Sequence, residues 1–269
     1  MIEPLTAGLT HRVLAHLELA RARPSVAYLG HLIAAYGQHV PWESASRIAR
    51  HAFCLPGGEC PRWPEIFWEE ALSLGTGGTC FESNLAFFSL LRALGFEGYL
   101  TINNMKDSIG CHTACVIEQG GEQWLADAGY PVYAPLQIDP LRETTATSPW
   151  LDYSLTPAGP DEYTVTQSPH ARPYAFSLIN TPVSIARYRA ATLDDYGEQG
   201  LFLSRIIVLR VVHGKVQRFD SSQETNAVEV FERGRKHEEA LSDDPAAALS
   251  ARFGVNLRVL REAFAALRG

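Results

Sequence analysis

Residues 75–84, GTGGTCFESN, place one cysteine between a glycine-rich stretch and a helical pattern. Over residues 81–94 the apolar side chains recur at spacings of three and four, and a glycine follows as a C-terminal stop. This pattern predicts an amphipathic helix that begins at Thr79 or Cys80. Unpaired backbone N–H groups and the helix dipole at such a start favour an anion. We therefore expect a lowered pKa for the Cys80 thiol.

The chain before this stretch is expected to be largely helical. Apolar residues at helical spacing predict two helices within residues 9–36, and a short helix is expected over residues 65–74. Between them, residues 37–64 contain the turn cluster LPGGECPRWP, and we expect them to be irregular.

After residue 97 the apolar period changes to two, which indicates strands. The expected strands are residues 98–105, 111–118 and 122–130. Gly120 and Gly121 suit the two-residue turn of a hairpin between the last two strands. A second hairpin is expected over residues 204–219, and residues 247–267 are again helical in pattern. Helices, then strands, then a mixed tail predict an α+β protein rather than a parallel βαβ array.

Composition and charge exclude several classes of function. The chain has 269 residues, a formal net charge of −7 and a pI of about 5.7, and no basic run offsets the acidic balance. This argues against nucleic acid as the main partner. No apolar run approaches the roughly 20 residues that a membrane span needs. The N-terminal residues lack the pattern of a signal peptide, so a cytoplasmic protein without a membrane partner is expected.

The chain has five cysteines, an odd number without an export signal, which predicts reduced thiols rather than disulfides. They are Cys54, Cys60, Cys80, Cys111 and Cys115. No pair has the C-x₂-C spacing of common zinc sites, so we expect no metal site.

A histidine and an aspartate complete a candidate constellation with Cys80. His112 opens one strand of the first hairpin, and Asp127 lies late in the other. A two-residue turn would place Ala114 opposite Asp127, so that His112 and Asp127 lie diagonally on one face of the sheet. A carboxylate beside an imidazole supports its cationic form and fixes its tautomer, as an activated acyl-transfer nucleophile requires. The alternatives are a buried structural cysteine, a core histidine and a turn aspartate.

These motifs together resemble those of the arylamine N-acetyltransferase family, which includes related amide synthases. The matching stretches are TGGTCFESN (76–84), GCHTACVIE (110–118) and WLADAGY (124–130). HVPWESAS (39–46) is also similar to the Ile-Pro-Phe-Glu-Asn motif of that family. The likeness runs from about residue 10 to the end of the chain and is strongest between residues 77 and 130.

The resemblance implies a fold of three parts with a cysteine-protease-like core. Residues 1–95 would form an N-terminal helical bundle that carries the nucleophile. Residues 96–190 would form an antiparallel β-barrel-like domain that carries the histidine and the aspartate. Residues 191–269 would form a C-terminal α/β lid.

The resemblance also implies a ping-pong mechanism without a bound cofactor. Cys80 would take an acyl group from acetyl-CoA or another thioester, and a small amine would then accept it. His112 would shuttle the proton, and Asp127 would orient the imidazole. The backbone N–H of Cys80, at the helix start, is a candidate donor to the oxyanion.

Six further residues match motif positions of the family. Glu82 and Asn84 are expected to support the loops around the site. Trp42, Phe81, Gly129 and Tyr130 are expected to bind substrate, with ordinary core packing as the alternative for the aromatic residues.

The chain departs from the family pattern at three places. Thr76 stands where the motif has an arginine, so a charge that braces the site is expected to be absent. Pro131 stiffens the loop after the aspartate. Residues 54–64 look like an insertion or a divergent loop. These differences concern the identity of the substrates rather than the triad.

Four functions stay open from the sequence. The first is an N-acyltransferase acting on an arylamine, a hydrazine or a related amine. The second is an amide synthase that takes its acyl chain from an acyl carrier protein, with basic residues at 21–24 or 232–237 as the contact. The third is a thiol hydrolase or transpeptidase with the same triad. The fourth is an inactive binding module.

Overall fold

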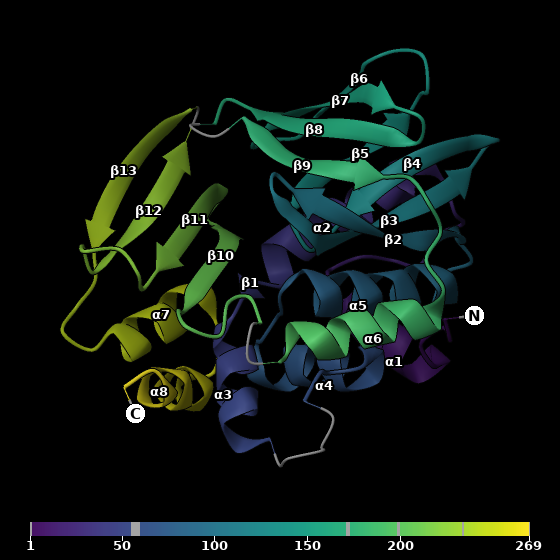
Figure 1. The fold of residues 1–269 in the computed structure, drawn as a ribbon. Helices are drawn as coiled ribbons and strands as arrows, with labels where there is room; N and C mark the ends of the chain where they lie inside the picture. The colour runs from purple at the N-terminus through teal and green to yellow at the C-terminus, as the bar shows by residue number, and fades with distance from the viewer. Residues whose placement is uncertain (1, 55–59, 171–172, 198–199, 233, 269) are drawn as a thin grey trace.

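The computed structural model describes residues 2–54, 60–170, 173–197, 200–232 and 234–268. The fold is α+β, as predicted, with a group of helices below a large antiparallel sheet and a second sheet beside them (Figure 1). Within the described residues, no helix has both the length and the apolar character needed to cross a membrane.

The chain order alternates from helices to strands and back to helices. The helices are α1 (Ala7–His16), α2 (Val26–His39), α3 (Ala45–Phe53), α4 (Pro64–Leu74), α5 (Cys80–Ala93), α6 (Ile185–Asp195), α7 (Pro245–Phe253) and α8 (Leu257–Ala266). The strands are β1 (Trp42–Glu43), β2 (Glu97–Met105), β3 (Ser108–Gln119), β4 (Glu122–Asp127), β5 (Val132–Ile138), β6 (Thr144–Thr147), β7 (Asp152–Gly159), β8 (Glu162–Ser168), β9 (Tyr174–Ile179), β10 (Ile207–Val212), β11 (Lys215–Asp220), β12 (Ala227–Glu232) and β13 (Arg235–Ala240).

Helix α5 is the centre of the N-terminal core. Every residue from Cys80 to Leu91 is buried, because α1, α2, α4 and the large sheet surround it. A helix that is covered on all sides can carry apolar residues all round, which is why its sequence period is less clean than that of a surface helix. The helix ends at Ala93, and Gly95 follows with a positive φ of 91°, as the sequence predicts.

The large sheet has eight strands in the order β5-β4-β3-β2-β9-β8-β7-β6. Its two edges approach each other, since β5 contacts β6 and β7, and the sheet nearly closes into a barrel. The hairpin β3–β4 turns at Gly120 and Gly121, which have φ values of 67° and 81°. Both residues therefore adopt the left-handed conformation of a type I′ turn, and the predicted register is confirmed from Cys115↔Ala126 to Gln119↔Glu122.

The second sheet has five strands in the order β1-β10-β11-β12-β13 and packs with α7 (Figure 1). The hairpin β10–β11 turns at His213 and Gly214, as expected. Strand β1 comes from residues 42–43, far back in the chain, and pairs with β10. Helix α3 likewise contacts α8, so residues 42–53 pack with the C-terminal part of the chain. The domain limits expected from the sequence stay a prediction.

One expectation about residues 37–64 is wrong. The segment is not irregular throughout, because residues 45–53 form α3, where Ala45, Ile48 and Ala49 are buried against the C-terminal helices. The charged residues between these positions weaken the helical pattern in the sequence. Helix α3 forms because of its packing against distant parts of the chain. The expected turn residues 55–59 lie outside the described residues.

The prediction that all cysteines are reduced is wrong for one pair. Cys54 and Cys60 form a disulfide, with their Cα atoms 5.7 Å apart. This distance lies within the range that a disulfide can span. The cysteines at positions 80, 111 and 115 are free thiols.

Candidate active site

Cys80 lies at the first position of α5, as the sequence predicts. The preceding residue, Thr79, has extended backbone and makes no side-chain cap, so the backbone N–H groups of the first turn have no capping side chain. Cys80 is 5% exposed, and its Sγ lies 3.5 Å from the carbonyl oxygen of Cys111 on β3. The nucleophile candidate is thus held between the start of α5 and the strand that carries His112.

His112 and Asp127 form a buried pair across the β3–β4 hairpin. His112 Nε2 lies 2.6 Å from Asp127 Oδ2, and neither side chain exposes more than 2% of its area. The backbone pairing of β3 with β4 ends at Cys115↔Ala126. Beyond this pair, the side chains of His112 and Asp127 meet on one face of the hairpin, as the predicted register requires. With Nε2 occupied by the carboxylate, Nδ1 is the ring nitrogen left for a thiol proton.

The second oxygen of Asp127 is fixed by three N–H groups. Asp127 Oδ1 accepts hydrogen bonds from Asn84 Nδ2 at 2.9 Å, from the backbone N–H of Gly129 at 2.7 Å and from that of Tyr130 at 2.9 Å. These donors hold the carboxylate plane and leave only Oδ2 for the imidazole.

Asn84 connects the helix of Cys80 to both strands of the hairpin. Its amide also donates to the carbonyl oxygen of Thr113 at 2.6 Å, and its Oδ1 accepts from the backbone N–H of Ala128 at 2.9 Å. Thr113 in turn donates from its hydroxyl to the carbonyl oxygen of Cys80 at 3.1 Å. The supporting role expected for Asn84 stays a prediction, and these contacts are the observations that favour it.

The pKa of the Cys80 thiol lies well above its ordinary value. Burial is the main cause, and the negative charges of Asp195 and Asp127 add to it, while Arg47 opposes it. The expectation of a lowered thiol pKa is therefore wrong, because burial outweighs the effect of the helix start. A neutral thiol in the resting protein needs a base that takes its proton during the reaction.

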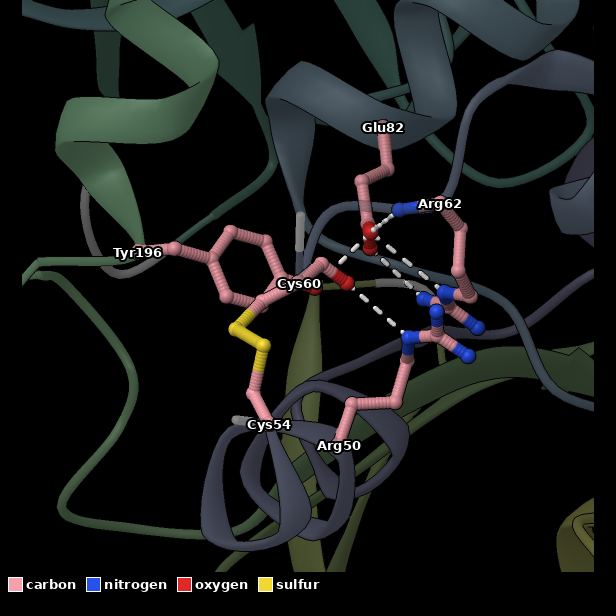
Figure 2. Close-up of a disulfide and its surroundings, with 6 residues drawn as sticks. All are labelled: Arg50, Cys54, Cys60, Arg62, Glu82 and Tyr196. Atoms are coloured by element: carbon pink, nitrogen blue, oxygen red, sulfur yellow. Dashed lines mark hydrogen bonds and ion pairs between the residues drawn. A yellow bond between two sulfur atoms is a disulfide. The ribbon is translucent and has the colours of Figure 1, made fainter. Parts of the chain in front are cut away.

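A buried arginine supplies the charge that the sequence analysis expected to be absent. Arg62 Nη2 lies 2.6 Å from Glu82 Oε2, and both side chains are fully buried (Figure 2). Arg62 Nη1 also lies 3.4 Å from the hydroxyl oxygen of Thr76. A guanidinium from another segment of the chain therefore lies beside Thr76, the position where the family motif has an arginine.

The residues expected to bind substrate lie at different depths. Tyr130 is half-buried beside His112, with the two ring centres 6.2 Å apart. Trp42 is half-buried, and its backbone forms a bridge with Gly78 in the glycine-rich stretch. Phe81 is buried in the N-terminal core against the ring of Tyr188. Substrate binding by these residues and by Gly129 stays a prediction.

Comparison with known proteins identifies the family of this chain. A family model described as N-acetyltransferase matches residues 64–259, which is more than half of the chain. This chain belongs to the arylamine N-acetyltransferase family. A search of curated proteins finds no match.

Solved structures of this family share the fold across nearly the whole chain. An arylamine N-acetyltransferase from Salmonella typhimurium has a TM-score of 0.80 at 18% identity, covering 97% of this chain and 100% of the other. The enzyme from Mycobacterium abscessus has a TM-score of 0.78 at 19% identity, covering 99% of each chain. The enzyme from Mycobacterium marinum, solved in complex with CoA, has a TM-score of 0.80 at 17% identity, covering 96% and 98%. The predicted cysteine-protease-like fold is confirmed.

A second ion pair, which the sequence did not predict, lies near Cys80. Arg47 Nη1 lies 2.8 Å from Asp195 Oδ2, and the Arg47 guanidinium lies 4.0 Å from the centre of the Tyr196 ring. Arg47 comes from α3, and Asp195 and Tyr196 come from the end of α6. Neither helix was predicted from the sequence. Across the described residues, no group of three or more His, Cys, Asp or Glu side chains is placed to hold a metal ion.

Gly129→Ala should damage the active site of this family member through crowding. A Cβ at this position would lie 2.4 Å from Asn84 Nδ2 and 2.6 Å from Cys80 Cα, so the helix start or the loop must shift. A displacement near 1 Å in a catalytic geometry can lower turnover by about 10²-fold. Steady-state kinetics should show this loss, whereas Gly8→Ala, where nothing lies within 4 Å, should keep wild-type rates.

Acid should destabilise the protein through Glu82. Burial raises the pKa of Glu82, but its contacts with Arg62 and the Tyr196 hydroxyl outweigh burial and leave the pKa below the ordinary 4.5. A carboxyl whose folded pKa is depressed contributes stability above its unfolded pKa and loses it as pH falls through the folded value. Urea unfolding should therefore show a free energy of unfolding that declines below about pH 4.5.

Glu82→Gln isolates this contribution. It should flatten the acid decline and lower stability at pH 7 by about 3 kcal/mol, because Arg62 would lose its buried partner. An unchanged pH dependence in this variant would show that other carboxyl groups cause the decline.

Proposed function

We propose that this protein moves an acyl group, in the first instance acetyl, from a thioester to an amine through an acyl-enzyme on Cys80. The observation that supports this most strongly is the buried pair of His112 and Asp127 beside a free thiol at a helix start. Cysteine, imidazole and carboxylate in this arrangement are the parts of an activated acyl-transfer nucleophile.

The first half-reaction begins with a proton transfer. Because the pKa of the Cys80 thiol is raised, the sulfur attacks the thioester carbonyl as its proton passes to Nδ1 of His112. The new C–S bond forms, and the negative charge moves to the carbonyl oxygen. The backbone N–H of Cys80 faces no capping side chain and is a candidate donor to that oxygen.

Collapse of this intermediate completes the acyl-enzyme. The bond to the donor sulfur breaks, and the imidazolium of His112 returns its proton to the leaving thiolate. Asp127, held by three N–H groups, keeps the ring in one orientation through both transfers. The amine then attacks the acyl-enzyme by the reverse sequence, and the Cys80 thiol is regenerated.

Acetyl-CoA and an arylamine are the proposed substrates, since the chain belongs to the N-acetyltransferase family. The half-buried rings of Tyr130 and Trp42 are candidates for the acceptor site, because planar rings pack well against aromatic amines. The expected cytoplasmic location and the absence of a bound cofactor stay predictions.

No observation favours the carrier-protein alternative. Among the basic residues expected to contact a carrier, Arg21 donates to the carbonyl oxygen of Ala93, and Lys236 pairs with Glu229 at 2.8 Å. Arg233 lies outside the described residues. The hydrolase alternative would require water to replace the amine in the second half-reaction.

Initial-rate kinetics test the ping-pong order. With acetyl-CoA varied at several fixed concentrations of 4-methoxyaniline, double-reciprocal plots should give parallel lines, because the first product leaves before the amine binds. Lines that intersect would show that both substrates bind together and would exclude the proposed order. Continued CoA release without any amine, beyond one equivalent per enzyme, would instead favour the hydrolase, because water would then resolve the acyl-enzyme.

A further inference from the structure

Arg62 makes a charged contact with the helix turn that carries Cys80, although it belongs to no motif and precedes residues 64–259. Its Nη2 pairs with Glu82 Oε2 at 2.6 Å, and its backbone N–H donates to Glu82 Oε1 at 2.7 Å. One residue thus holds both oxygens of a carboxylate that is fully buried. Such a pair is strongly directional, because neither charge can turn to water.

The ion pair touches the chain on both sides of the nucleophile. Glu82 lies two residues after Cys80, in the first turn of α5, and Gly78 lies two residues before it. A Cβ on Gly78 would lie 3.1 Å from Glu82 Oε2 and 3.2 Å from Arg62 Nη2. The pair therefore packs directly against the glycine-rich stretch, and any shift of the pair moves the backbone that carries Cys80.

The segment that carries Arg62 is itself anchored. Cys60 is bridged by the disulfide to Cys54, just past the end of α3, and its carbonyl oxygen accepts from Arg50 Nε at 2.9 Å (Figure 2). On the other side of the pair, the Tyr196 hydroxyl donates to Glu82 Oε1 at 2.7 Å. Glu82 is thus held from two directions, by a disulfide-anchored loop and by the residue after α6.

We propose that Arg62 is a positioning residue for Cys80, which acts through Glu82 and Gly78 to keep the thiol beside the strand of His112. The proposal rests on the proposed role of Cys80 as nucleophile. Thr76 Oγ1 lies 3.4 Å from Arg62 Nη1, so a side chain at position 76 can reach the same place. In this proposal the guanidinium group positions Cys80, and an arginine at position 62 or at position 76 can supply it.

Two variants separate positioning from simple stabilisation. The double variant Arg62→Gln/Glu82→Gln removes both charges of the pair together, and Glu70, the second carboxylate beside Arg62, keeps its ion pair with Arg50 at 2.9 Å. The double variant Arg62→Ala/Thr76→Arg removes the guanidinium from one segment and supplies it from the other. Urea unfolding at pH 7 establishes that each variant is folded before rates are compared.

The rates to measure are turnover with acetyl-CoA and 4-methoxyaniline, and alkylation of Cys80 by iodoacetamide. In the folded Arg62→Gln/Glu82→Gln variant, kcat and the alkylation rate should each fall by about tenfold or more, while KM for acetyl-CoA changes little. The relocated arginine should recover most of both losses. The proposal would be overturned if the folded Arg62→Gln/Glu82→Gln variant kept both rates within about twofold of wild type. It would also be overturned if the folded Arg62→Ala/Thr76→Arg variant recovered neither kcat nor the alkylation rate.

The alkylation arm also separates this proposal from the proposed function. Iodoacetamide reports the reactivity of Cys80 without any acyl donor. If the wild-type protein forms no acetyl adduct but its alkylation rate still depends on Arg62, the proposed function fails and the positioning role stands. If the adduct forms and the alkylation rate does not depend on Arg62, the proposed function stands and the positioning role fails.

Discussion

Replacing Cys80 with serine should lower acetyl transfer by about 10⁴-fold or more, because a hydroxyl is a far weaker nucleophile than a thiol that yields its proton to His112. The fold should be unchanged. The only hydrogen-bond contact of Sγ among the described residues is the carbonyl oxygen of Cys111 at 3.5 Å, and a hydroxyl can still donate to it. Turnover and thermal unfolding of the purified variant measure the two effects separately.

Cys111→Ser is the matched control for this substitution. Cys111 is a free thiol next to His112 in sequence, it is partly exposed, and its Sγ contacts the carbonyl oxygen of Ser108 at 3.2 Å. The same chemical change there should leave most of the activity. If Cys80→Ser kept substantial turnover, the acyl-enzyme on Cys80 would have to be abandoned.

Asp127→Asn should lower turnover on the order of 10⁴-fold by selecting the wrong tautomer of His112. The three N–H groups that now donate to Asp127 Oδ1 would hold the amide oxygen of the new side chain in that place. Its NH₂ group would then face His112 Nε2, which lies 2.6 Å from Oδ2. The imidazole would have to accept there and carry its proton on Nδ1, so it could not take the proton of the thiol.

Steady-state kinetics of this variant should show the loss in kcat/KM, and the protein should remain folded because the amide replaces the carboxylate with little change in volume. Asp107→Asn, in the exposed turn between β2 and β3, is the control and should behave as wild type. Wild-type rates for Asp127→Asn would mean that the pair with His112 has no part in the reaction.

Much of the site could be predicted because it depends on local rules. The start of α5 follows from the change from glycines to a helical period, and the meeting of His112 with Asp127 follows from a two-residue turn at Gly120 and Gly121. Once the turn type is known, the register of the hairpin is determined, and side chains on one face are determined with it.

The parts that could not be predicted depend on contacts between distant segments. Arg62, which pairs with Glu82, lies two residues after the disulfide-bonded Cys60, and cysteine spacing alone does not reveal the pairing of Cys60 with Cys54. Helix α3 and strand β1 are stabilised by C-terminal elements more than 150 residues later in the chain. The pKa of Cys80 is raised because the thiol is buried and because Asp195 of α6 and Asp127 of the hairpin add negative charge nearby, which a helix-start argument does not include.

Intact-protein mass spectrometry after mixing the protein with acetyl-CoA, without an amine, tests the central claim most directly. We expect one acetyl adduct on the wild-type protein and none on Cys80→Ala. Alkylation by iodoacetamide, measured in parallel, shows that the thiol is accessible. An adduct that persists in Cys80→Ala, or no adduct on a wild-type protein whose Cys80 is alkylated, would contradict an acetyl-enzyme formed on Cys80 from acetyl-CoA.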